Sequence, residues 1–154
     1  MSALLIAAMA LASPDAKADD AMGAASNCYD VKLIARPIEQ IPSEIPDCGS
    51  DCIIMSWPWF VDLKVTRVLD GQVADKTIGI LTVQHTYMVR KDGVWLLRMS
   101  STGGYNALRY TEEHGIERCP AGTPPTRPYI GTGDPHALNA LREAGKARYG
   151  THAR

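Results

Sequence analysis

The chain has little excess charge and no long hydrophobic run. Its 16 Lys and Arg residues against 17 Asp and Glu residues leave a net charge of −1, which gives no field to attract nucleic acid or an anionic membrane surface. The longest apolar run, residues 3–12, is too short for a membrane-spanning helix, which needs roughly 20 residues. We therefore expect neither nucleic-acid binding nor a membrane anchor in the mature protein.

Several catalytic motifs are also missing. The segment 100–104 is rich in serine and glycine but lacks the Gly-x-Ser-x-Gly elbow of serine hydrolases. Residues 131–133 precede a candidate helix, yet the third glycine of the dinucleotide fingerprint and the Gly-Lys-Ser/Thr of the P-loop are absent. No Cys-x-x-Cys pair is present for thiol–disulfide exchange. These absences argue against the corresponding enzyme classes.

The apolar run at the N-terminus is typical of an export signal. It is followed by Ala16-Lys17-Ala18, a small-x-small triplet that suits a signal peptidase. We predict that residues 1–18 are a signal peptide, cleaved after Ala18, and that residues 19–27 are a flexible mature N-terminus; a buried N-terminal helix is the alternative. Cys28 does not follow the small residues that a lipoprotein signal requires. The mature protein is predicted to be periplasmic or secreted.

An even number of cysteines in an exported chain predicts two disulfides. Three pairings are possible. We favour Cys48–Cys52 as a local clip, because Gly49-Ser50-Asp51 can turn tightly, which leaves Cys28 with Cys119 as a long cross-link. A zinc site built on Cys48, Cys52 and either His85 or Cys119 is the alternative, but only one ligand pair has the usual spacing. We expect no metal and no other cofactor.

Residues 28–154 suffice for one domain and are too few for two ordinary ones. The first predicted strand covers residues 29–35, and the prolines and cysteines of residues 36–51 predict a long loop. Residues 59–69 alternate as a strand with Trp59 facing inward, a bulge near residues 67–68 and a turn at Asp70-Gly71.

The second half of the chain predicts a meander followed by a helix. Residues 77–89 and 94–99 are predicted strands joined by a turn at Lys91-Asp92-Gly93, residues 105–110 are a further short strand, and residues 120–133 are irregular. Asp134 followed by Pro135 is a typical helix start, with Leu138, Leu141 and Ala144 at helical spacing up to residue 149. We predict a mainly β fold: a small five-stranded barrel or curved antiparallel sheet with one C-terminal helix packed on it.

This element order, with the strand Phe60-Val61-Asp62-Leu63-Lys64-Val65-Thr66-Arg67-Val68-Leu69 ending in Asp70-Gly71, resembles the netrin-like modules of tissue inhibitors of metalloproteases. The resemblance implies an OB-like barrel. In those inhibitors a cysteine at the mature N-terminus chelates the protease zinc, whereas Cys28 here follows residues 19–27. Protease inhibition is therefore not implied. The chain also looks like small exported proteins of Gram-negative bacteria, which implies no activity.

The candidate ligand-binding residues are Trp57, His85, Tyr87 and Arg90. Trp57-Pro58-Trp59 could form a stacking platform, although core burial is the favoured interpretation; of the two tryptophans, Trp57, which precedes the rigid Pro58, is the better candidate for exposure. His85 and Tyr87 are two residues apart on the predicted strand 77–89 and should point the same way. No neighbouring residue in the sequence supplies the carboxylate or nucleophile that a catalytic histidine needs, so a hydrogen-bonded structural histidine is the favoured interpretation and no catalytic residue is assigned.

These observations favour a non-enzymatic binding module, whose partner is a protein, a glycan or a small molecule. Two alternatives stay open. One is a small periplasmic hydrolase in which folding brings an acidic residue to His85. The other is an assembly subunit that pairs with another chain through an exposed strand edge.

Overall fold

The computed structural model describes residues 28–45, 53–108, 115–131 and 134–151. The elements in chain order are β1 (Cys28–Tyr29), β2 (Val31–Pro42), β3 (Trp57–Asp70), β4 (Thr77–Gln84), β5 (Gly93–Met99), β6 (Tyr105–Ala107), β7 (Glu117–Arg118) and α2 (Pro135–Tyr149). The predicted signal peptide, the predicted mature N-terminus and the Cys48–Cys52 pair lie outside the described residues. Among the described helices, none has the length and apolar character needed to cross a membrane.

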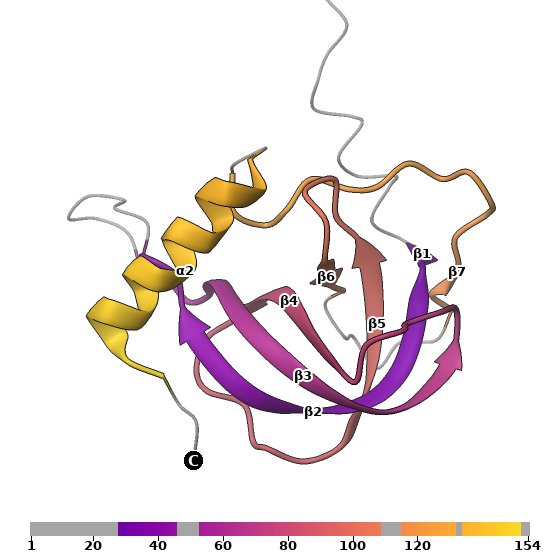
Figure 1. The fold of residues 1–154 in the computed structure, drawn as a ribbon, viewed down its shortest axis with the longest axis horizontal. Coiled ribbons are helices and arrows are strands. Elements are labelled where there is room, and N and C mark those ends of the chain that lie inside the picture. Colours follow the sequence, from indigo (N-terminus) through magenta and orange to yellow (C-terminus); the bar gives the residue numbers. More distant parts are fainter. Residues whose placement is uncertain (1–27, 46–52, 109–114, 132–133, 152–154) are drawn as a thin grey trace, which may run out of the picture.

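Five strands close into a barrel in the order β2-β3-β4-β6-β5 (Figure 1). Neighbouring strands are antiparallel except β4 and β6, which run parallel. The predicted small barrel with one C-terminal helix is confirmed. A parallel pair requires a crossover between its strands, and here β5 lies on that crossover.

The first barrel strand is longer than the sequence predicts. Residues 36–42 were expected in a loop because of their prolines, but β2 continues to Pro42. Pro37 lies just after the last pair with β5, Ala35 with Gly93, and beside a register shift against β3. Pro42 is the last residue of the strand. A missing N–H is tolerated at a bulge or a strand end, so neither proline interrupts the barrel.

The predicted features of the next strand are confirmed. β3 pairs with β2 through register shifts that leave Thr66 and Leu69 without a partner, on either side of residues 67–68. β3 ends at Asp70, and Gly71 has a φ of 80°. A Cβ at this glycine would lie 2.5 Å from the Asp30 carbonyl oxygen, so the chain reversal requires glycine for both reasons.

The predicted meander is correct for β3 and β4 and wrong for β4 and β5. β6 lies between β4 and β5, and β5 pairs with β6 and β2. β4 ends at Gln84 rather than at residue 89, and residues 85–92 pass round the lower end of the barrel before β5 begins (Figure 1). Local turn residues predicted a hairpin, but the pairing of β4 with β6 depends on residues far along the chain. Residues 105–107 form the predicted further strand.

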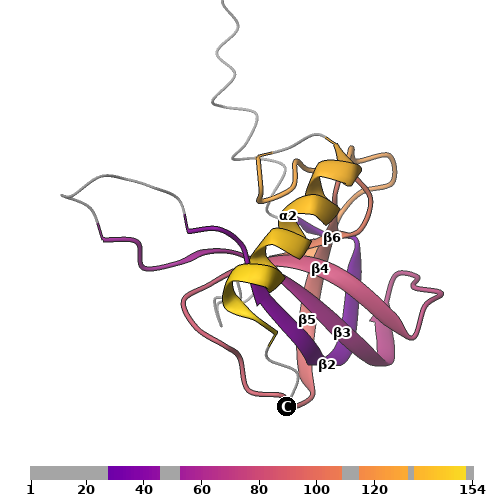
Figure 2. The ribbon, with the colours of Figure 1, turned by 60° about the vertical axis from the view of Figure 1, so that its left-hand side comes forward.

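Two apolar clusters hold the fold. The barrel interior contains buried side chains of every barrel strand, including Trp59 at 2% exposure, as predicted. The outer cluster, Ile41, Phe60 and Leu81, receives Leu138 and Leu141 of α2, which lies across the outside of the barrel (Figure 2). Gly145 is the buried residue of the helix. A Cβ at Gly145 would lie 2.3 Å from the Pro42 carbonyl oxygen, so glycine lets the helix approach the barrel.

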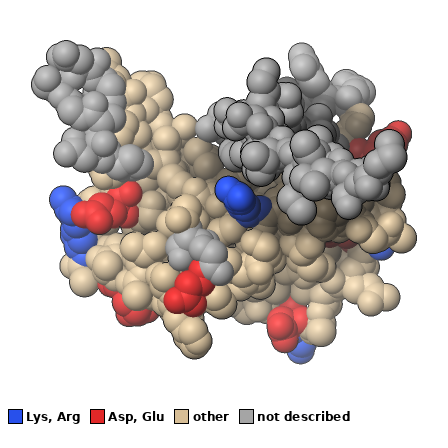
Figure 3. Space-filling model, turned by 90° about the horizontal axis from the view of Figure 1, so that it is seen from above, with Lys and Arg blue, Asp and Glu red and all other residues tan. Residues whose placement is uncertain are grey.

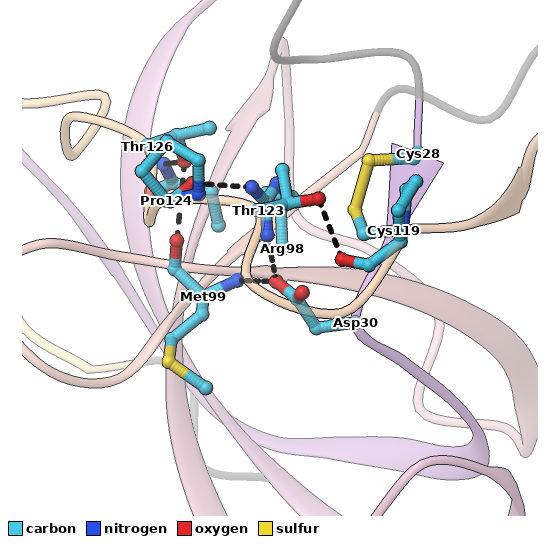
Figure 4. Close-up of polar contacts among 10 residues, drawn as sticks. Cys28, Asp30, Arg98, Met99, Cys119, Thr123, Pro124 and Thr126 are labelled. Carbon is cyan, nitrogen blue, oxygen red and sulfur yellow. Dashed lines mark hydrogen bonds and ion pairs between the residues drawn. A yellow bond between two sulfur atoms is a disulfide. The ribbon is translucent and has the colours of Figure 1, made fainter.

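A polar network lies at the Arg98–Met99 end of β5. The predicted Cys28–Cys119 disulfide is present. Beside it, Asp30 Oδ2 accepts hydrogen bonds from the Arg98 guanidinium and from the Met99 backbone N–H (Figure 4). Arg98, whose side chain is 1% exposed, also donates to the Pro124 carbonyl. These contacts fix residues 119–126 against the outer face of β5.

A candidate ligand-binding groove at the mouth of the barrel

An apolar groove of about 740 Å³ opens at the other end of β5. The β4–β5 connection, the start of β5 and the end of β6 form its walls, and most of the side chains that line it are apolar: Pro37, Val83, Tyr87, Met88, Val89, Val94, Trp95, Leu96, Ala107 and Leu108. Val89 is 74% exposed and Val94 is 48% exposed. We call this surface the mouth groove. Exposed apolar side chains gathered round a hollow are typical of a binding surface.

Aromatic rings support the groove from behind. Tyr87, which lines it, meets the buried Trp59 edge to face, with ring centroids 4.8 Å apart. The ring of Trp57 lies 5.4 Å from that of Trp59. Trp57 is therefore half-buried against the core, in line with the core burial favoured for this segment. Edge-to-face packing fixes the orientation of Tyr87, and with it one wall of the groove.

A buried glutamine holds the β4–β5 connection in place. Gln40 is 0% exposed. Its amide donates to the Met88 carbonyl (2.8 Å) and accepts from the Met88 backbone N–H (2.8 Å). The Gln84 amide donates to Gln40 Oε1 (3.2 Å) and to the Thr86 carbonyl (3.1 Å). The backbone polar groups of this irregular segment are thus satisfied by side chains, which keeps Met88 and its neighbours against the barrel.

Three buried polar atoms close to Gln40 and the aromatic rings behind the groove have no hydrogen-bond partner within the described ranges. They are Nε1 of Trp57, Nε1 of Trp59 and Oε1 of Gln84. Trp57 and Gln84 are paired across β3 and β4, so two of the three atoms come from directly opposed residues. Unpaired buried polar groups are rare in folded proteins. Their concentration at this end of the barrel distinguishes it from the Asp30–Arg98 end.

A second hollow, of about 310 Å³, adjoins the mouth groove. Arg36, Pro37, Ile38 and Arg90 line it, and Pro37 lines both hollows. Arg90 Nε donates to the Pro37 carbonyl (3.2 Å) and Nη2 donates to the Ile38 carbonyl. These carbonyls belong to the part of β2 that has already separated from β5. The guanidinium therefore covers a strand edge that would otherwise be open.

The four predicted site residues do not converge on one point. Tyr87 lines the mouth groove, Arg90 lines the adjoining hollow, and Trp57 lies behind the groove. His85 lies after β4, exposed, with its Nδ1 atom 2.5 Å from the Met55 carbonyl oxygen. Because the strand ends at Gln84, His85 and Tyr87 do not share a strand face as the sequence predicts.

Nothing in the described ranges supplies His85 with a hydrogen-bonded carboxylate, and no three His, Cys, Asp or Glu side chains within them are grouped to hold a metal ion. Cys119 is bonded to Cys28, which removes it as the zinc ligand considered above. His85 therefore has a structural contact and no described catalytic partner.

Elsewhere on the barrel, charged groups pair with one another. Arg142 of α2 donates to both carboxylate oxygens of Asp62 (2.9 and 2.8 Å) and to Glu39 Oε2 (2.6 Å). Hydrogen bonding to Asp62 raises the pKa of Arg142 above its ordinary value. In the coloured part of Figure 3, acidic and basic side chains are scattered over a mainly uncharged surface and neither sign forms a broad patch. That face offers no basic strip for nucleic-acid phosphates.

Sequence reasoning missed most of the groove. Met88, Val89 and Val94 were apolar members of predicted strands and gave no sign of exposure. Gln40 fell in the predicted loop, although a glutamine between the apolar residues Ile38 and Ile41 is a signal for a buried polar contact. The groove forms because β6 lies between β4 and β5 and keeps them apart. The local sequence pattern does not predict this strand order.

Comparison with known proteins adds no relative: no family model, curated protein or solved structure matches the chain. The resemblance to netrin-like modules therefore stays a prediction.

Proposed function

We propose that the protein is an exported, non-enzymatic binding module, and that the mouth groove is where it holds a small apolar ligand. The observation that carries the proposal is the groove itself, about 740 Å³ in volume with apolar walls and exposed Val89 and Val94. Ligand pockets of small molecules have volumes of about 300 to 1,000 Å³ and occur in the mouths of β-barrels.

Two alternatives receive less support. A hydrolase centred on His85 needs an acidic partner, and within the described ranges His85 contacts only the Met55 carbonyl. A subunit that joins another chain through a strand edge needs an open edge. The barrel is closed, and Arg90 covers the carbonyls of β2 beyond its pairing with β5. The proposal of ligand binding at the mouth groove is therefore preferred.

Export is the second part of the proposal. The Cys28–Cys119 disulfide supports it, because such bonds persist in oxidising compartments. Intact mass of the protein recovered from an expressing Gram-negative host tests it directly. We expect a chain that begins at Asp19 and in which Cys28 and Cys119 react with an alkylating reagent only after reduction. An uncleaved chain with free thiols at these two positions would contradict export.

Ligand binding is tested with the neutral alcohol dodecanol, followed by tryptophan fluorescence, because Trp95 lines the groove. We compare Val94→Gln with Met99→Gln. Both residues lie on β5 with similar exposure, 48% and 46%, but at opposite ends of the strand. Loss of the Val94 apolar contact should weaken dodecanol binding about fivefold to tenfold, and Met99→Gln should bind as the unmodified protein does. Equal affinities of the two variants, or no saturable binding, would refute the proposal.

A further inference from the structure

We propose that the ligand is an anionic amphiphile, a single-chain carboxylate such as a fatty acid. Its headgroup is held by Arg36 and Arg90 and its chain lies in the mouth groove. This inference rests on the proposed function and adds the charge and the orientation of the ligand. The juxtaposition that carries it is an apolar groove that shares a wall residue, Pro37, with a hollow lined by two arginines.

The hollow is basic and has no acidic side chain among its lining residues. Arg36 is exposed and makes no hydrogen bond or ion pair with any described residue. Lys91 lines the mouth groove on the same connection as Arg90, and no Asp or Glu lines either hollow. A chain with a net charge of −1 thus places three basic side chains and no acidic one around a single apolar surface. This local excess would attract an anion.

Arg90 is suited to hold a headgroup because its position is fixed. Its Nε and Nη2 atoms donate to two carbonyls of β2. A guanidinium has five N–H donors, so others stay available to a carboxylate. A guanidinium held in advance loses less freedom on binding than a free one. Arg36 then supplies a second positive charge from the strand itself.

The apolar part of the ligand is oriented by the same geometry. Besides Pro37, the residues Met88, Val94, Ala107 and Leu108 line the groove. A headgroup in the basic hollow places the start of an alkyl chain at Pro37 and the remainder against these side chains. Dissolved monomeric amphiphile is the source to which we commit. A membrane surface would require a broad basic face, and the overall charge does not provide one.

The test compares three dodecyl compounds: sodium dodecanoate and dodecyltrimethylammonium below their micelle concentrations, and dodecanol below its solubility limit. We expect dodecanoate to bind about tenfold more tightly than dodecanol, because a charge-assisted hydrogen bond adds to the same apolar contact, and the cation to bind more weakly than dodecanol. Higher salt should weaken dodecanoate binding and leave dodecanol binding unchanged.

Two variants distinguish the contribution of the headgroup contacts to the affinity from the contribution of the apolar groove. Arg36 makes no hydrogen bond or ion pair with a described residue, so Arg36→Gln should not disturb the fold. It should lower the affinity for dodecanoate towards the affinity for dodecanol, and leave the affinity for dodecanol unchanged. Arg90→Lys keeps the positive charge but loses the planar guanidinium with its several N–H donors. It should also reduce the ratio of the affinity for dodecanoate to the affinity for dodecanol. The matched control is Arg67→Gln, an exposed arginine on β3 that lines neither hollow.

Three other results would each overturn the inference of an anionic ligand. Equal affinities for dodecanoate and dodecanol, both sensitive to Val94→Gln, would overturn the anionic ligand and leave the proposed function standing. No binding of any dodecyl compound would overturn both. Cosedimentation with phosphatidylglycerol vesicles, without saturable dodecanoate binding, would replace the dissolved ligand with a membrane surface and so overturn this inference.

Discussion

The two ends of β5 differ in whether their buried polar groups are paired. At the Arg98–Met99 end, a buried guanidinium is paired with Asp30, the adjoining loop is hydrogen-bonded, and the Cys28–Cys119 disulfide lies alongside. At the end that begins with Gly93, apolar side chains are exposed and nearby buried polar atoms have no partner in the described ranges. The difference indicates that the first end, which we call the stapled end, secures the fold, while the mouth groove is where we propose that the ligand binds.

The largest expected effect is loss of the disulfide. Cys28 and Cys119 are separated by 91 positions in the chain. Restricting a loop of that length in the unfolded chain stabilises a protein by about 4 to 5 kcal/mol in the chain-entropy model. We predict that the Cys28→Ser/Cys119→Ser double variant loses free energy of unfolding of this order in urea denaturation. A loss below about 1 kcal/mol would show that the stapled end does not secure the fold.

The buried ion pair should have the next largest effect. Asp30→Asn keeps an acceptor but leaves the Arg98 charge buried without its counter-charge, which should cost about 3 kcal/mol. The matched control is Arg118→Gln, which removes the exposed ion pair with Asp70 and should cost less than about 1 kcal/mol. Chemical denaturation of both variants gives the comparison, and equal losses would contradict the special role of the buried pair.

Substitutions in the mouth groove should have much smaller effects on stability. Val89 and Val94 are exposed, so Val89→Gln and Val94→Gln should change the free energy of unfolding by less than about 0.5 kcal/mol. The same denaturation measurement checks this. A loss comparable to that of Asp30→Asn would mean that the groove is part of the stabilising core, and the contrast between the two ends of β5 would fail.

The smallest expected effect is a dependence on acid pH at the stapled end. The Tyr29 hydroxyl donates to Asp70 Oδ2 (3.0 Å), and this hydrogen bond lowers the pKa of Asp70 below its usual 3.8. A lowered carboxyl pKa stabilises the fold above the unfolded-state value, and the contribution disappears as the pH falls through the folded-state pKa. Tyr29→Phe should therefore reduce stability at neutral pH and flatten its decline below about pH 4. Identical pH profiles of the variant and the unmodified protein would contradict this assignment.

Much of the fold can be predicted from local patterns. Asp134 and Pro135 start α2 as expected, and the Asp134 side chain accepts from the His136 backbone N–H (2.9 Å). The alternation of residues 59–69 predicts that Trp59 faces inward, and the tight turn that Gly49-Ser50-Asp51 allows between Cys48 and Cys52 leaves Cys28 to pair with Cys119. In each case the interaction is encoded within a few residues, or by a small number of cysteines.

The parts that could not be predicted depend on distant residues. The prolines of β2 indicated a loop, but they lie where the strand leaves β5 or ends, so the ladder does not need their N–H groups. Lys91-Asp92-Gly93 indicated a hairpin, but β6 takes the place beside β4. Arg98 lies between Leu97 and Met99, which the alternation of residues 94–99 places on the opposite face, so the local pattern gives no sign that Arg98 is buried. Its contacts come from residues distant in the chain: Asp30, and the Pro124 carbonyl of the 119–126 loop.

The central claim is that the mouth groove, and not the stapled end, is the binding surface. The most direct test is NMR of the amide groups during titration with dodecanol. The account predicts that the largest chemical-shift changes fall on residues 87–91 and 93–96, which line or adjoin the groove. Changes centred instead on Cys28, Arg98 or Cys119 would contradict it and move the binding site to the opposite end of β5.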